Sequence, residues 1–140
     1  MNTFNLHILA ADKSFYNGEC VSLVFPTIDG QYGIMAHHKN MVAAVNIGEL
    51  RFTKPDGATE IAAVSNGIIR VEDNDVLVLV NTAERPEEID YIRAKAGADK
   101  AREALIQKKS TREYHNAQIK LARELNRQKI KRNYDNSFLK

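Results

Sequence analysis

The chain changes character at Arg85-Pro86, and this change limits what the sequence can fold into. Upstream, short apolar stretches alternate with turn-forming residues. Proline suits the first turn of a helix, and it pushes the residue before it toward an extended conformation. The sequence therefore predicts an α+β chain: an antiparallel β-sandwich domain over residues 1–85, followed by a two-helix antiparallel hairpin over residues 86–140.

Turn-forming clusters divide the first part into short segments. Apolar residues alternate within these segments, as in strands with one buried face, while the continuous run Val76–Val80 predicts a strand covered on both faces. Such short, evenly spaced strands predict a small antiparallel sandwich or barrel. The turn clusters are Asn17-Gly18, Asp29-Gly30, Pro55-Asp56-Gly57, Asn66-Gly67 and Asp73-Asn74-Asp75, and the alternating sets are Phe4, Leu6, Ile8 and Val21, Leu23, Phe25.

The second part has helical periodicity. One helix is predicted from Pro86 to about Gln107, with Lys108 and Lys109 at its negative end, and Ser110 with Glu113 matches a capping box that opens a second helix. The apolar stripes are narrow and rich in alanine, so the helices can pack closely but bury little area, and we expect a mobile hairpin. The stripes are Ala94, Ala98, Ala101, Leu105 and Tyr114, Ala117, Leu121, Leu125, with a frayed or partner-ordered end predicted over residues 133–140.

Composition narrows the function classes. The 140 residues suffice for one domain or two very small ones, and the single Cys20 is predicted to be a small core residue. His7, His37, His38 and His115 show no metal-ligand spacing, so no metal site is predicted. The N-terminus lacks a basic segment followed by an apolar run, which predicts a soluble chain that reaches membranes only through partners.

Charge is divided unequally along the chain. Residues 1–88 carry 6 Lys/Arg against 12 Asp/Glu, and residues 89–140 carry 14 against 6, so a net charge of −6 precedes one of +8. This asymmetry predicts either two parts that attract each other or a basic tail for an acidic partner.

The hexapeptide Ile89-Asp90-Tyr91-Ile92-Arg93-Ala94 opens the helical part. On a helix, Asp90 and Arg93 would project from one face, where a carboxylate and a guanidinium could grip a purine and a phosphate. The alternative is an ordinary helix start with Ile89 and Ile92 facing the core, and these six residues alone favour that alternative.

A sandwich of about 85 residues, followed by a basic hairpin that opens with Ile-Asp-x-x-Arg-Ala, resembles the epsilon subunits of bacterial F-type rotary ATP synthases. Departures from the family occur at Lys39-Asn40-Met41, where Ala-Pro-Leu is usual, and at Asn66–Val71, where Gly-Gly-x-x-Glu-Val is usual. They concern subunit contacts near His38 rather than the fold. The similar segments are Val24–Met35, His38, Asn46–Arg51 and Asn81–Glu84, in the family's order and spacing.

The resemblance implies a non-catalytic, peripheral subunit at the cytoplasmic face of the bacterial inner membrane, associated with the membrane only through its complex. The implied partners are the gamma subunit, the rotor c-ring and the catalytic beta subunit. Gln31 would face the polar loops of the ring and His38 would lie near gamma; without the resemblance, both are ordinary loop residues.

The resemblance also implies ATP as a possible regulatory ligand of the folded hairpin. Arginine forks suit phosphate oxygens, and a carboxylate can accept from the adenine amino group. Lys100 departs from the arginine of ATP-binding members, which keeps the charge but loses the fork. The implied ligand set is Glu84, Ile89, Asp90, Arg93, Ala94, Lys100, Arg123 and Arg127.

Without ATP, the resemblance implies a hairpin that extends along gamma and blocks rotation in the hydrolysis direction. It would then offer a basic row to an acidic segment of beta. This row consists of Lys120, Arg123, Arg127 and Lys131.

Two other classes of function were weighed. A nucleic-acid-binding module could use the basic tail and stack bases on Tyr114 and Tyr134, but the acidic first part would repel a phosphate backbone, so no nucleic-acid partner is predicted. A free-standing enzyme is disfavoured because the sequence lacks a phosphate loop, a nucleophile elbow and a paired-carboxylate pattern.

Overall fold

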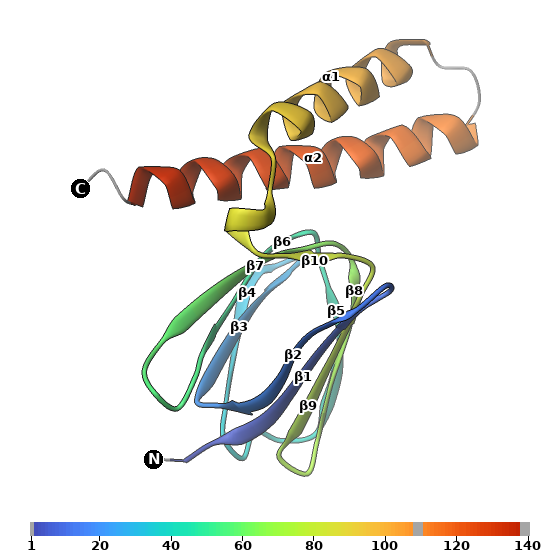
Figure 1. The fold of residues 1–140 in the computed structure, drawn as a ribbon. Coiled ribbons are helices and arrows are strands. Elements are labelled where there is room, and N and C mark those ends of the chain that lie inside the picture. The colour runs from blue at the N-terminus through green and yellow to red at the C-terminus, as the bar shows by residue number, and fades with distance from the viewer. Residues whose placement is uncertain (1, 108–110, 138–140) are drawn as a thin grey trace. The chain divides into compact units, whose positions relative to one another are not determined.

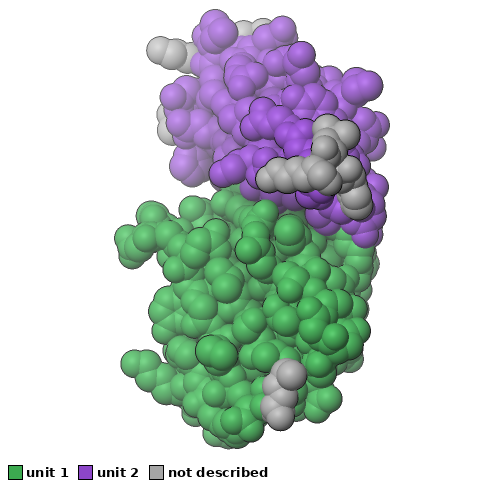
Figure 2. Space-filling view, turned by 90° about the vertical axis from the view of Figure 1, so that its left-hand side faces the viewer, with its two compact units in different colours: residues 1–85 green, residues 86–140 purple. Residues whose placement is uncertain are grey.

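The structure, a computed structural model, describes residues 2–107 and 111–137. The chain divides into two compact units, residues 1–85 and residues 86–140, which Figure 2 colours separately. Each unit is described by itself below.

The first unit is a sandwich of two five-stranded sheets (Figure 1). Neighbouring strands are antiparallel, with the exception of β1 and β9, which run parallel from Asn5 opposite Asp75 to Ala10 opposite Val80. The predicted sandwich followed by two helices is confirmed. One sheet has the order β2 (Ser14–Cys20), β1 (Phe4–Ala10), β9 (Asp75–Val80), β8 (Gly67–Glu72), β5 (Met41–Val45), and the other β10 (Ala83–Glu84), β7 (Thr59–Val64), β6 (Gly48–Thr53), β3 (Ser22–Thr27), β4 (Gly30–Met35).

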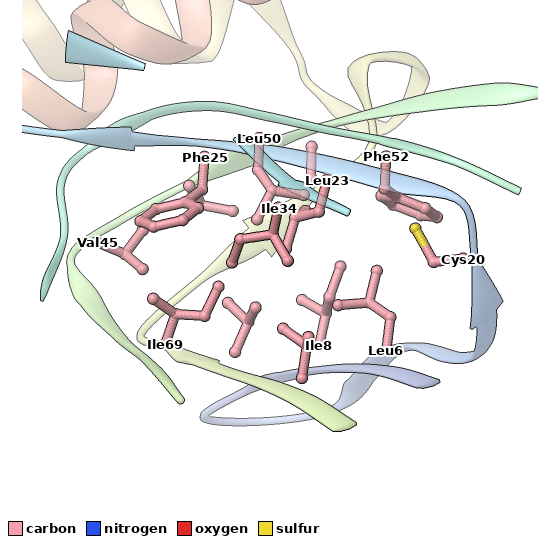
Figure 3. Close-up of a cluster of buried hydrophobic side chains, with 14 of the residues drawn as sticks. Leu6, Ile8, Cys20, Leu23, Phe25, Ile34, Val45, Leu50, Phe52 and Ile69 are labelled. Carbon is pink, nitrogen blue, oxygen red and sulfur yellow. The ribbon is translucent and has the colours of Figure 1, made fainter. Parts of the chain in front are cut away.

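Apolar side chains from both sheets fill the space between them. The predicted alternation of β1 is confirmed, because Phe4, Leu6 and Ile8 are buried. Figure 3 shows Leu6 and Ile8 pointing toward Leu23 and side chains of the opposite sheet. The fully buried side chains include Phe25, Ile34, Leu50, Phe52 and Ile69, and Cys20 is a buried core residue as predicted.

Strand β9 is covered on one face, so the prediction that both faces are covered was wrong. Val76, Val78 and Val80 are buried, whereas Leu79 is 39% exposed and Leu77 is partly exposed. In a two-layer sandwich each strand has one inner face, and successive side chains point alternately toward the core and toward the outer surface. The continuous apolar run of β9 therefore reflects strand propensity as well as burial.

The turn predicted at Asn17-Gly18 was wrong, because both residues lie inside β2. Gly18 pairs with Leu6, and a β-carbon at Gly18 would lie 3.0 Å from the hydroxyl oxygen of Tyr16. That hydroxyl donates to the carbonyl of Glu19 at 2.7 Å, so the tyrosine ring occupies the space left by the missing side chain. Strand pairing thus overrides the local turn preference. The other four predicted clusters lie at connections between strands.

The second unit contains a short 3-10 helix, η1 (Pro86–Glu88), and two long helices, α1 (Tyr91–Gln107) and α2 (Thr111–Ser137). Figure 1 shows α1 and α2 side by side in opposite directions. α1 begins at Tyr91 rather than at Pro86. α2 remains helical through residues 133–137, where a frayed or partner-ordered end was predicted. The predictions for Lys108, Lys109 and Ser110 lie outside the described residues. Within the described ranges, neither helix is both long and apolar enough to cross a membrane.

The alanine stripe of α1 is buried as predicted, at Ala94, Ala98 and Ala101. On α2 the prediction is only partly correct. Ala117 is buried, but Tyr114 and Leu125 are each 37% exposed. The buried face of α2 passes through position 124 rather than position 125, and a polar side chain occupies it.

Candidate functional site

Asp90 caps the start of α1. Its Oδ1 accepts a hydrogen bond from the backbone N–H of Arg93 at 3.1 Å, and its own carbonyl accepts from the N–H of Ala94 at 3.0 Å. An aspartate at this position pairs with an otherwise unpaired backbone N–H of the helix, and its negative charge interacts favourably with the positive end of the helix dipole. Asp90 therefore lies one residue before α1 with its carboxylate against the backbone of Arg93, and the joint grip of the two side chains on a ligand stays a prediction.

The flanking isoleucines differ from the ordinary helix start considered above. Ile89 is buried, as that alternative requires, but Ile92 is 80% exposed. Ile89 is therefore buried just before α1, the first turn of α1 buries Ala94, and Asp90 and Arg93 are both exposed.

The two helices meet closely at Gly97 and Glu124. A β-carbon at Gly97 would lie 2.8 Å from Oε2 of Glu124 and 2.9 Å from its Cδ, which is closer than real β-carbons approach other atoms. The Glu124 side chain is only 12% exposed and forms an ion pair with Arg127, whose side chain is 23% exposed. Gly97 therefore leaves room for a carboxylate between the helices.

Four cationic side chains lie within one helical turn of this contact. Arg93 and Lys100 are four residues before and three after Gly97, so they share its side of α1. Arg123 and Arg127 flank Glu124 and, being four apart, share one side of α2. We call Arg93, Lys100, Arg123 and Arg127 the basic cluster.

Arg123 carries an unpaired donor. Its Nε is buried and has no hydrogen-bond partner among the described residues, the sole side-chain nitrogen or oxygen there of which this is true. A buried donor without a partner costs about 1–3 kcal/mol, and more when it is charged. An acceptor supplied from outside the chain, such as a phosphate oxygen, would remove that cost.

The partner-contact residues predicted in the first unit lie on and beside β4. Gln31 is exposed and pairs with Pro26 inside β4, so it is a strand residue rather than part of the loop that was expected. His38 follows β4, and its Nδ1 lies 2.8 Å from the carbonyl of Lys39. A carbonyl only accepts, so in the neutral imidazole Nδ1 carries the proton, and Nε2 accepts from the hydroxyl of Tyr32 at 3.1 Å.

Asparagines tie the connection between β4 and β5 to the turn between β8 and β9. The backbone N–H of His37 donates to Oδ1 of Asn74 at 2.7 Å, and that of Asp73 donates to Oδ1 of Asn40 at 2.9 Å. Nδ2 of Asn74 also donates to the carbonyl of Thr3 at 3.0 Å. These bonds hold the backbone around His38 in place.

Residues 3–86 match the family described as "ATP synthase, Delta/Epsilon chain, beta-sandwich domain". The "ATP synthase epsilon chain" of Ruminiclostridium cellulolyticum is 39% identical over 127 residues, which are 91% of this chain and 94% of the relative. The chain belongs to the ATP synthase epsilon-chain family. The epsilon chain of Caldicellulosiruptor bescii is 38% identical over 93% of this chain and 94% of its own length.

Solved structures show the same fold. A chain of the Euglena gracilis mitochondrial ATP synthase superposes with a TM-score of 0.75 at 21% identity, covering 87% of this chain and 77% of that one. The resemblance predicted from the hexapeptide and the sandwich segments is confirmed.

The predicted ATP ligands of this epsilon chain lie in both units. Glu84 lies in β10 of the first unit, paired with Ala63, and the other seven predicted ATP ligands lie in the second. Lys120 is exposed on α2, and Lys131 forms an ion pair with Asp135 at 3.4 Å. Within the described residues, no three or more His, Cys, Asp or Glu side chains form a group that could hold a metal ion.

Glu124 was absent from the predictions for this epsilon chain. Arg123 and Arg127 were predicted because they match two arginines of ATP-binding family members, and that set of residues does not include position 124. The sequence does contain one indication. Gly97 inside a predicted helix requires a reason, and a closely packed partner side chain is such a reason.

Proposed function

We propose that the chain is the non-catalytic epsilon subunit in the central stalk of a rotary ATP synthase. Its family membership supports this proposal, as does its alignment over nearly the full length of curated epsilon chains. The structures that share its fold are those of mitochondrial ATP synthases, one comprising F1 and the c-ring and the other the central stalk and c-ring. In this role the sandwich would contact gamma and the rotor ring, with His38 and Gln31 at those contacts, and membrane association at the cytoplasmic face would come through the complex.

The second part of the proposal is that the helical hairpin binds ATP as a regulatory ligand. The observation that carries it is the buried Nε of Arg123, which has no hydrogen-bond partner in the part of the chain that the structure describes. It lies beside Arg127 and within one turn of the contact between α1 and α2. Phosphate oxygens would accept from the two arginines, with Arg93 and Lys100 adding charge from α1. Ile89, Asp90, Ala94 and Glu84 complete the proposed set.

Asp90 would act through the backbone as well as through its charge. Because its carboxylate caps α1, it fixes the helix turn that carries Arg93. We propose that this ordering is a large part of its contribution to the nucleotide site.

ATP would then select the folded hairpin. A ligand specific for one state stabilises it by about 1.4 kcal/mol at ten times Kd and about 2.7 kcal/mol at a hundred times Kd. Loss of ATP would release the basic row Lys120, Arg123, Arg127 and Lys131 for an acidic segment of the beta subunit, and the extended hairpin would inhibit ATP hydrolysis. Cellular ATP would thereby control whether the motor can rotate in the hydrolysis direction.

Titration calorimetry of the full chain tests the nucleotide site. ATP should bind saturably and GTP more weakly, and the double variant Arg123→Ala, Arg127→Ala should lose binding. Arg102→Ala, at an exposed α1 residue paired with Asp99, is the matched control and should bind as the wild type does. Equal ATP affinity in the double variant and in the control would refute the site.

The role of Asp90 needs two variants. Asp90→Ala removes both cap and charge, whereas Asp90→Ser keeps a capping oxygen and removes the charge. Weak binding by Asp90→Ala with substantial recovery in Asp90→Ser would assign the role to the cap.

A further inference from the structure

We propose that Glu124 acts as an internal competitor for the anion site, so that a bound phosphate must displace its carboxylate from Arg127. The inference rests on the proposed nucleotide site. It adds a residue, Glu124, that lowers the affinity for the ligand by competing with it for Arg127.

The position of Glu124 is unusual for a helix glutamate. Its side chain is largely buried, it lies against Gly97 of the other helix, and it pairs with Arg127. An exposed surface ion pair would be expected to contribute little. Both side chains of this pair are partly shielded from water, so charge at this point has larger effects on a ligand that binds beside it than charge on an exposed pair would have.

The two arginines on either side are left in different states. The Arg127 guanidinium already has an anionic partner, whereas the Nε of Arg123 has none among the described residues. The Glu124 carboxylate therefore accepts from Arg127 but leaves the Nε of Arg123 without an acceptor in the described part of the chain. A phosphate has several acceptor oxygens and could accept from both arginines.

Two consequences follow when a phosphate approaches. Arg127 must exchange the Glu124 carboxylate for the phosphate. The displaced carboxylate remains close by, and its negative charge repels the phosphate. Both effects weaken nucleotide binding relative to a chain with a neutral residue at position 124. In the empty hairpin, the same carboxylate offsets repulsion within the basic cluster, which favours closure of the helices without ligand.

Glu124→Gln tests this inference, since glutamine keeps the size of the side chain and removes the charge. Glu103→Gln is the matched control, because Glu103 is exposed on α1 and the substitution changes net charge equally. Calorimetry with ATP and with inorganic tripolyphosphate should show roughly tenfold tighter binding of both by Glu124→Gln, and unchanged binding by Glu103→Gln.

The outcomes separate this inference from the proposed function. Tighter tripolyphosphate binding by Glu124→Gln, with no ATP binding by any variant, would support the competition and refute the nucleotide site. ATP binding that depends on Arg123 and Arg127 but is unchanged or weakened in Glu124→Gln would keep the site and overturn the competition. Absence of binding by either probe to every variant would overturn both.

Discussion

Gly97 on α1 and Glu124 on α2 lie so close together that any side chain at position 97 would require Glu124 to shift: a β-carbon there would lie 2.9 Å from the carboxyl carbon of Glu124. Replacing an interior helix glycine by alanine ordinarily stabilises a helix by about 1 kcal/mol. Here we expect Gly97→Ala to give no gain or a loss, because the new methyl group displaces a largely buried carboxylate.

In a Glu124→Ala background, Gly97→Ala should recover the usual gain, so the two substitutions should show a coupling energy of about 1 kcal/mol or more. Thermal unfolding and amide hydrogen exchange over α1 and α2 measure it. Ala104→Gly, at an exposed α1 position, should lose stability equally in both backgrounds. Equal effects of Gly97→Ala in the two backgrounds would contradict the contact.

Asn74 should stabilise the sandwich through its side chain and its backbone together. It has a φ of 65°, and its side chain bonds to His37 and Thr3. Asn74→Gly keeps the left-handed backbone accessible and should lose about 1–3 kcal/mol from the two hydrogen bonds. Asn74→Ala should lose about 1 kcal/mol more, because alanine is strained in that conformation. Urea unfolding ranks the three chains, and a glycine variant as stable as the wild type would show that these bonds contribute nothing.

Cys20 should react slowly while the chain is folded. Burial raises the pKa of its thiol, and the Sγ–H donates to the carbonyls of Ser22 and Thr53. A raised pKa means that the native state holds the proton more tightly. The contribution of Cys20 to stability is therefore complete below the unfolded pKa of about 8.5 and is lost as the pH rises above it. A thiol reagent at pH 8 should label the chain in strong denaturant far faster than in buffer, and rapid labelling of the folded chain would contradict the burial.

Lys100→Arg should strengthen ATP binding if Lys100 belongs to the proposed site. The guanidinium adds a bidentate fork where lysine supplies a point charge, and we expect about three- to tenfold tighter binding. Lys95→Arg, at another exposed position on α1, is the control and should leave affinity unchanged. An identical response of the two variants in calorimetry would remove Lys100 from the site.

The sandwich was largely predictable because its core follows period-two alternation, as at Phe4, Leu6 and Ile8. The sequence failed where pairing outweighed local preference. Asn17-Gly18 has strong turn chemistry, but β2 continues through it because β1 supplies hydrogen bonds on one side and Tyr16 covers the glycine.

The two helices of the hairpin could be predicted from the sequence, but the face of α2 that is buried could not. A stripe through Ala117 and Leu121 continues equally well to position 124 or 125, and hydropathy selects Leu125. The structure places Glu124 inward because Gly97 leaves space for it. This contact depends on how the two helices pack together, so the apolar pattern of either helix alone does not predict it. The cap at Asp90 was missed for a related reason, since Pro86 was taken as the first residue of a continuous helix, whereas η1 ends at Glu88.

The parallel pairing of β1 with β9 determines when the sandwich can be completed during synthesis. Asn5 lies opposite Asp75, so the first strand to leave the ribosome has its parallel neighbour 70 residues later. Until then β1 can hold only the hairpin with β2, whose inner face includes the buried Phe15. A nascent chain that stalls before β9 emerges would leave one edge of β1 without its backbone hydrogen bonds, and the first strand of the chain therefore completes its pairing only when β9 is added.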